Sequence, residues 1–151
     1  MTAVRENDLS ASMEDYLEAI HNLAAESNVA RGKDIAELLG VSRASVSGAL
    51  RVLKDKGLAN YKPYGYVTLT DNGRTAAVEV VRRHNILKSF FADVLGVDDD
   101  IAEQAACKAE HTLGPEVIGR LLAFIEFATR ENKKGYDLAT KFERFCSRKK
   151  K

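Results

Sequence analysis

DIAELLGVSRASVSGALRVLKDKG, residues 34–57, contains two short helical patterns joined by a turn. The first pattern ends at Gly40, a residue that commonly terminates helices. Ser42 can cap the second helix, which ends at Gly57 and turns Val46, Ala49, Leu50 and Leu53 toward the interior. The outer face of this second helix is rich in serine and arginine. This arrangement is typical of a helix-turn-helix.

The flanking segments extend this pattern in both directions. Upstream, apolar residues at helical spacing predict a helix to about Glu26, capped by Ser10 or Ser12. Downstream, LANYKPYGYVTLT alternates polar and apolar residues around a turn, which predicts a two-stranded hairpin, or wing. Helical patterns then continue to the C-terminus, with breaks near Gly96 and Gly114. We therefore predict a mainly α chain, with a winged helix-turn-helix domain at 1–74 and a helical domain at 75–151.

Composition narrows the class of protein. The 151 residues are 45% hydrophobic, which is enough for a sizeable core. The two cysteines, Cys107 and Cys146, have no paired spacing, and this favours a reducing compartment over a disulfide framework. We find neither a signal-peptide pattern nor an apolar run of roughly 18 residues, the length that spans a bilayer. We expect a cytoplasmic protein that does not contact the membrane.

The net charge of +1 conceals a strong alternation along the chain. Residues 1–30 carry −5 and residues 31–74 carry +4, whereas residues 92–131 carry −6 and residues 132–151 carry +6. Such blocks suit one module that meets a polyanion and another that meets cations. The alternative is that they are only the solvated faces of helices.

The second helix of the pair has the composition of a recognition helix. Such a helix needs small or short polar residues for close approach to the groove, with a few long donors for bases and phosphates. Arg43 is the best candidate for reading guanine, and Arg31 and Tyr66 are further candidates for backbone contacts. Ordinary exposed residues of a helical bundle would look similar, but the hairpin favours DNA binding. The predicted DNA-binding residues are Lys33, Ser42, Arg43, Ala44, Ser47, Arg51, Lys62 and Tyr64.

Three separated segments carry side chains that can ligate a metal. They are MEDYLE at 13–18, RRHNIL at 82–87 and CKAEH at 107–111. Within a helix, a spacing of three or four residues projects side chains toward one side. Oxygen, nitrogen and sulfur donors together suit a first-row divalent ion. Each segment alone is a weak indication, because single acidic residues are usually solvated and single histidines are usually packed.

Taken together, these segments resemble the diphtheria toxin repressor family (DtxR/MntR) of iron- and manganese-dependent repressors, in its two-domain form. SMEDYLEAI, the helix-turn-helix stretch, YGYVTLTDNGR, RRHNILKSFF and CKAEH occur in the family's order, over nearly all of residues 10–130. The resemblance implies a homodimer built from helices after residue 75. It also implies that the regulatory metal is bound by Asp15, Glu18, His84, Glu110 and His111.

Some positions depart from each branch of the family. Asp15 and Glu18 resemble the residues that the manganese regulators carry at these positions, whereas Cys107 stands where the iron regulators carry cysteine. Lys88 stands where the iron branch uses an acidic ligand for a further site, and a charged lysine cannot ligate. Glu103, one turn before Cys107, can join a second ion with His84. The cofactor is accordingly expected to be Fe(II) or Mn(II), and the cysteine favours iron.

The expected function is that of a metal-dependent transcriptional repressor of metal homeostasis genes. Metal would order the dimer so that two recognition helices match a palindromic double-stranded operator. A metal-independent winged-helix regulator that responds to a small molecule or a partner protein is the alternative. An enzyme is disfavoured, because no nucleophile elbow or phosphate-binding glycine loop is present in the sequence.

Overall fold

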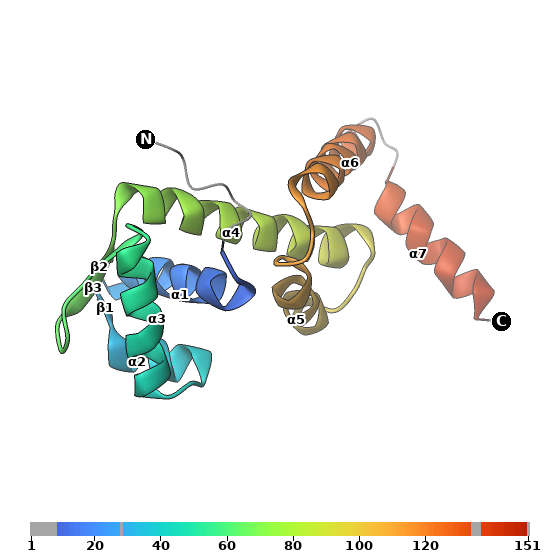
Figure 1. Ribbon diagram of the computed structural model, residues 1–151. Helices are drawn as coiled ribbons and strands as arrows, with labels where there is room; N and C mark the ends of the chain where they lie inside the picture. The colour runs from blue at the N-terminus through green and yellow to red at the C-terminus, as the bar shows by residue number, and fades with distance from the viewer. Residues whose placement is uncertain (1–8, 28, 134–136, 151) are drawn as a thin grey trace. The chain divides into compact units, whose positions relative to one another are not determined.

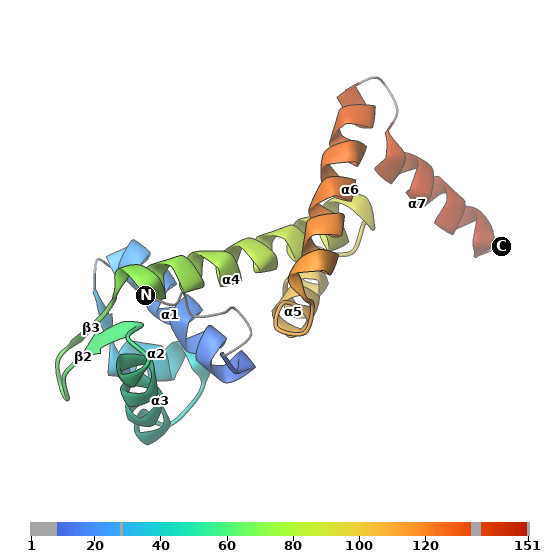
Figure 2. The same cartoon turned by 45° about the horizontal axis from the view of Figure 1, so that its top comes forward.

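The computed structural model describes residues 9–27, 29–133 and 137–150. It divides into two compact units, residues 1–81 and residues 82–151, and α4 (Asp71–Ser89) contributes to both. Figures 1 and 2 show the helices of each unit and the small sheet of the first. In the described part of the chain, no helix combines the length and the apolarity that crossing a bilayer requires.

The first unit is built on three helices. They are α1 (Ala11–Ser27), α2 (Gly32–Leu39) and α3 (Arg43–Asp55). Ser10 begins α1 as predicted, since its Oγ accepts a hydrogen bond from the Met13 N–H at 3.2 Å. Gly40 ends α2 with φ 64°, the left-handed conformation that favours glycine. The inward face predicted for α3 is confirmed, and its four apolar residues join Leu17, Ile20 and Ile35 in one buried core.

A three-stranded antiparallel sheet completes this unit. The strands are β1 (Ala30–Arg31), β2 (Ala59–Tyr61) and β3 (Tyr66–Leu69), in the order β1-β3-β2. β2 and β3 form the predicted wing, beside α3 in both views (Figures 1 and 2). At its tip Tyr64, a non-glycine residue, has a left-handed φ of 62° and is fully exposed. β1 was not predicted, because two residues are too short to display a period.

The junction between the wing and α4 is unusually tight. Thr70 caps α4: its Oγ1 accepts a hydrogen bond from the Gly73 N–H at 3.1 Å and donates to the Gly57 carbonyl at 2.7 Å. The Thr70 N–H also donates to the Leu58 carbonyl at 3.0 Å. Gly73 is buried against the same carbonyl, so that a Cβ added there would lie 1.8 Å from the Leu58 oxygen. The close approach of the two backbone segments therefore requires glycine at position 73.

The second unit is helical, as predicted. After α4, a π-helical turn η2 (Phe90–Val94) leads to α5 (Asp99–Ala109), α6 (Pro115–Lys133) and α7 (Leu138–Lys149). The predicted break falls between α5 and α6, where Pro115 opens α6. A small core joins Ile86 and Leu87 of α4 to Ala106 and Ile118. This core holds α4 against α5, and so it positions the polar side chains that project between these two helices.

Candidate metal centre and DNA-binding surface

A cavity with a volume of about 630 Å³ lies between α3 and the wing, and the residues that line it form a concave surface. Its lining is strongly basic and aromatic. Five of the predicted DNA-binding residues line it: Lys33, Arg43, Ser47, Arg51 and Tyr64. Cations with exposed aromatic rings suit the sugar-phosphate backbone and the base edges of nucleic acid.

The remaining three predicted residues lie outside this lining but are exposed. Ala44 is on the first turn of α3, and Lys62 is in the wing. Ser42 caps α3, because its Oγ accepts a hydrogen bond from the Ser45 N–H at 3.1 Å. Contact of these residues with DNA stays a prediction.

Arg31 and Tyr66 form an aromatic–cation pair at the edge of the same surface. The register of β1 with β3 places them opposite one another. The Arg31 guanidinium lies 5.1 Å from the Tyr66 ring centroid, and its Nη2 donates to the Tyr66 hydroxyl at 3.3 Å. Tyr61, which the sequence reasoning did not single out, also lines the surface and donates to Ser47 Oγ at 3.5 Å. The first contact depends on strand register and the second on the packing of β2 against α3, and the sequence alone revealed neither.

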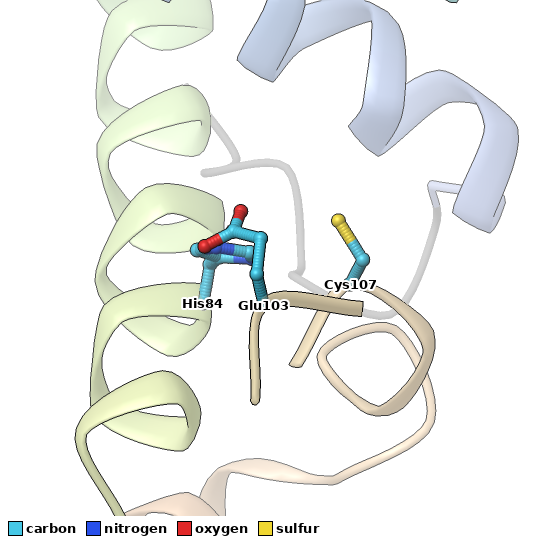
Figure 3. Close-up of side chains that lie close together, drawn as sticks. All are labelled: His84, Glu103 and Cys107. Atoms are coloured by element: carbon cyan, nitrogen blue, oxygen red, sulfur yellow. The ribbon is translucent and has the colours of Figure 1, made fainter. Parts of the chain in front are cut away.

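In the second unit, His84 on α4 faces Glu103 and Cys107 on α5 (Figure 3). The His84 Nε2 atom lies 2.8 Å from Glu103 Oε1. One donor atom from each of the three residues lies within 4.8 Å of the other two. His84 is buried, Glu103 is half-buried and Cys107 is exposed. Glu103 and Cys107 are four residues apart, so one face of α5 presents both to the histidine.

Glu110, just past the end of α5, is a fully buried carboxylate. Its Oε2 lies 2.6 Å from His84 Nδ1, and its Oε1 lies 3.2 Å from His111 Nε2. One carboxylate thus links the two histidines that the sequence singled out. Both nitrogens of His84 face carboxylates, and both donate only when the ring carries two protons.

Lys88, one turn after His84 on α4, makes an ion pair that the sequence reasoning did not anticipate. Its Nζ lies 2.9 Å from Glu103 Oε2, the carboxylate oxygen that does not contact His84. The hydrogen bond from Lys88 lowers the pKa of Glu103, and His84 adds a smaller lowering effect. The same contact raises the pKa of Lys88. Glu103 therefore stays ionised, held between a lysine and a histidine.

The donor set of this unit fits a divalent metal ion. Imidazole nitrogen, carboxylate oxygen and thiol sulfur are the ligand types that first-row ions such as Fe(II), Co(II) and Zn(II) accept. Glu110 at His84 Nδ1 matches a frequent feature of metal sites, in which a carboxylate holds the second ring nitrogen of a ligating histidine. The residues that can hold an ion here are His84, Glu103, Cys107, Glu110 and His111.

Asp15 and Glu18 belong to the first unit. Both are on α1, three residues apart and half-buried, as the helical spacing predicted. Burial raises the pKa of the neighbouring Tyr16 hydroxyl, and the Asp15 carboxylate adds to this increase. Their role as metal ligands stays a prediction that rests on the sequence resemblance.

A winged helix-turn-helix with a basic concave surface, followed by a helical unit with clustered histidine, cysteine and carboxylates, defines a DNA-binding regulator that responds to metal. Two family models match the chain. Residues 8–67 match the iron dependent repressor N-terminal DNA binding domain, and residues 70–138 match the iron dependent repressor metal binding and dimerisation domain. The chain belongs to this family (DtxR/MntR), which consists of metal-dependent transcriptional repressors and not of enzymes. The two matched domains imply DNA and a second copy of the chain as partners.

Relatives of both branches align over most of the chain. The transcriptional regulator MntR of Salmonella typhimurium is 37% identical over 123 residues, which are 82% of this chain and 78% of that protein. An uncharacterized HTH-type transcriptional regulator of Methanocaldococcus jannaschii is 36% identical over 119 residues, 78% of this chain and 95% of the relative. The diphtheria toxin repressor of Corynebacterium efficiens is 32% identical over 123 residues, and the match covers 82% of this chain.

Solved structures agree with these matches. A manganese-dependent transcriptional repressor in complex with manganese is 35% identical, with a TM-score of 0.69 over 76% of this chain. The alignment spans 53% of that repressor and 54% of the C. efficiens protein, about half the length of each.

Proposed function

We propose that this chain represses metal homeostasis genes by binding a palindromic operator as a homodimer when Fe(II) or Mn(II) is bound. The domain at 1–74 would bind the operator, and the domain at 75–151 would bind metal and dimerise. The convergence of His84, Glu103 and Cys107 donor atoms within 4.8 Å carries the proposal. The alternative, a metal-independent regulator, gives no reason for such a cluster.

The proposed ligands of the regulatory ion are Asp15, Glu18, His84, Cys107, Glu110 and His111, with Glu103 as a further candidate. The first two rest on the sequence resemblance. The others are supported by contacts within the second unit, where Glu110 links His84 and His111. A bound divalent cation supplies positive charge that offsets these carboxylates.

His84 has two roles in this proposal, one for each ring nitrogen. The Glu110 carboxylate fixes the proton on Nδ1, because its Oε2 lies 2.6 Å away. The Nε2 atom is then the ring nitrogen that can act as a ligand. Cys107 adds a thiolate, and we therefore favour Fe(II) over Mn(II).

The experiment that tests this function is an operator-binding titration under anaerobic conditions. DNA fragments selected from a random pool in the presence of metal supply the operator. Gel shifts with Fe(II), Mn(II), Co(II) and Zn(II) in turn should show a gain in affinity of about 5- to 150-fold for the activating ion, the range that is typical of allosteric coupling. Calorimetry that detects no binding of Fe(II) or Mn(II) to the metal-free chain would favour the metal-independent alternative.

Arg43→Ala should weaken operator binding. Arg43 is exposed at the start of α3 and lines the concave surface, so we expect it to donate to a base edge. Fluorescence anisotropy with the selected operator should show a loss of about 1–3 kcal/mol, with relaxed preference at one base pair. Arg120→Ala, an exposed arginine of the second unit, is the matched control. Equal affinity of both variants would remove Arg43 from the interface.

A further inference from the structure

Glu103 lies between two groups that compete for its charge. One carboxylate oxygen contacts His84 Nε2 at 2.8 Å, and the other contacts the Lys88 ammonium at 2.9 Å. The Lys88 side chain is 40% exposed and that of Glu103 is 46% exposed, so the ammonium has a route to solvent. Lys88 is therefore a cation that is already present beside a potential metal ligand and is free to move away from it.

The same carboxylate belongs to a group of three possible metal-binding donors in the second unit. His84 offers nitrogen, Cys107 offers sulfur and Glu103 offers oxygen, all within 4.8 Å of one another. A metal ion that binds Glu103 is repelled by the positive charge of Lys88, which already contacts this carboxylate. The oxygen that Lys88 contacts becomes available to the ion only when the ammonium moves away.

We propose that Lys88 is a built-in competitor that lowers the affinity of the His84–Glu103–Cys107 position for a divalent first-row ion. The ammonium occupies Glu103 when metal is scarce and is displaced when metal binds. The inference rests on the metal-binding role proposed above for the second unit. It adds a residue that sets the metal concentration at which this site is filled.

The expected size of the effect follows from electrostatics. After it leaves the carboxylate, a lysine ammonium about 6 Å from a doubly charged ion still repels it, and at a dielectric constant close to that of water this repulsion is equivalent to about a tenfold change in affinity. Loss of the half-exposed Lys88–Glu103 pair adds little to this figure, because such pairs are weak. Lys88→Met should therefore tighten metal binding about tenfold.

Co(II) titration of the full chain tests the proposal, with a Cys146→Ser background so that Cys107 is the remaining thiol. A thiolate bound to Co(II) gives a near-ultraviolet charge-transfer band, which reports ligation by Cys107 directly. Lys88→Met should shift the half-saturation point of this band to about tenfold lower Co(II), and Lys88→Arg, which keeps the charge, should leave it near the parent value. Cys107→Ser should abolish the band.

Glu103→Gln provides the decisive comparison. Lys88→Met and Glu103→Gln break the same ion pair, so a merely structural pair predicts that both shift Co(II) affinity in the same direction. The proposal requires opposite directions: tighter binding in Lys88→Met and weaker binding in Glu103→Gln. Shifts of the same sign, no shift in Lys88→Met, or no thiolate band in the parent would overturn it.

This readout is independent of DNA. If the repressor function were wrong, metal would fail to promote operator binding, yet the Lys88 and Glu103 variants would still move the Co(II) band in opposite directions. If only the competitor role were wrong, operator binding would respond to metal while Lys88→Met matched its parent. Circular dichroism of each variant confirms that the helices remain intact.

Discussion

Gly73→Ala should destabilise the first unit by about 3 kcal/mol, the upper end for inserting a methyl group into a packed site. An alanine Cβ at this position would lie 1.8 Å from the Leu58 carbonyl oxygen, and the obstacle is backbone, which has no rotamer to change. Relief requires the first turn of α4 to move away from the wing, which breaks the Thr70 cap. Urea unfolding followed by circular dichroism measures the loss.

Gly48→Ala is the matched control. Gly48 is also helical, on the exposed side of α3, and a Cβ there meets nothing within 4 Å. The added methyl group should stabilise the helix by about 0.5–1 kcal/mol, because alanine loses less backbone entropy than glycine. Opposite signs for the two alanine substitutions are expected, and equal stabilities would contradict the tight junction described for Gly73.

Glu110→Ala should abolish the metal-dependent gain in operator affinity while the dimer persists. This side chain is fully buried and contacts His84 Nδ1 at 2.6 Å and His111 Nε2 at 3.2 Å. Its loss removes a proposed ligand and also the group that fixes the tautomer of His84. Gel shifts with and without metal should differ by less than about twofold, against the 5- to 150-fold typical of intact allosteric coupling. Light scattering reports the dimer.

Two further variants sharpen this prediction. His111→Ala should give the same loss, because the histidine shares the Glu110 carboxylate. Glu143→Ala, an exposed glutamate on α7, should keep the full metal response. An unchanged gel shift in Glu110→Ala with metal would refute its assignment as a ligand.

The helices and the wing could be predicted from the sequence because their signals are local. Apolar periodicity placed α1 to α3, and Ser10 was one of the two caps expected for α1. β1 and the π-helical turn at Phe90–Val94 were not predicted. A two-residue strand is defined only by its partner β3, and a single π turn of five residues is too short to alter the apolar periodicity of the helix around it.

The metal centre could be predicted only in part. Spacing along one helix correctly grouped Cys107 with Glu103 on α5. Contacts between helices could not be predicted from the sequence, because the approach of His84 to Glu103 depends on how α4 packs on α5. Lys88 was interpreted only as a residue that cannot ligate, and its position on the Glu103 carboxylate required the tertiary structure.

Tyr64 at the tip of the wing bears on how this chain can be engineered. Its left-handed backbone, φ 62°, costs a bulky residue about 1 kcal/mol, and glycine or asparagine would avoid that cost. Variants selected from a library for heat resistance alone should therefore carry a substitution of this tyrosine early in the selection. If the ring contacts DNA as we propose, such thermostable sequences would lose operator affinity as they gain melting temperature, and selections on this chain should screen both properties together.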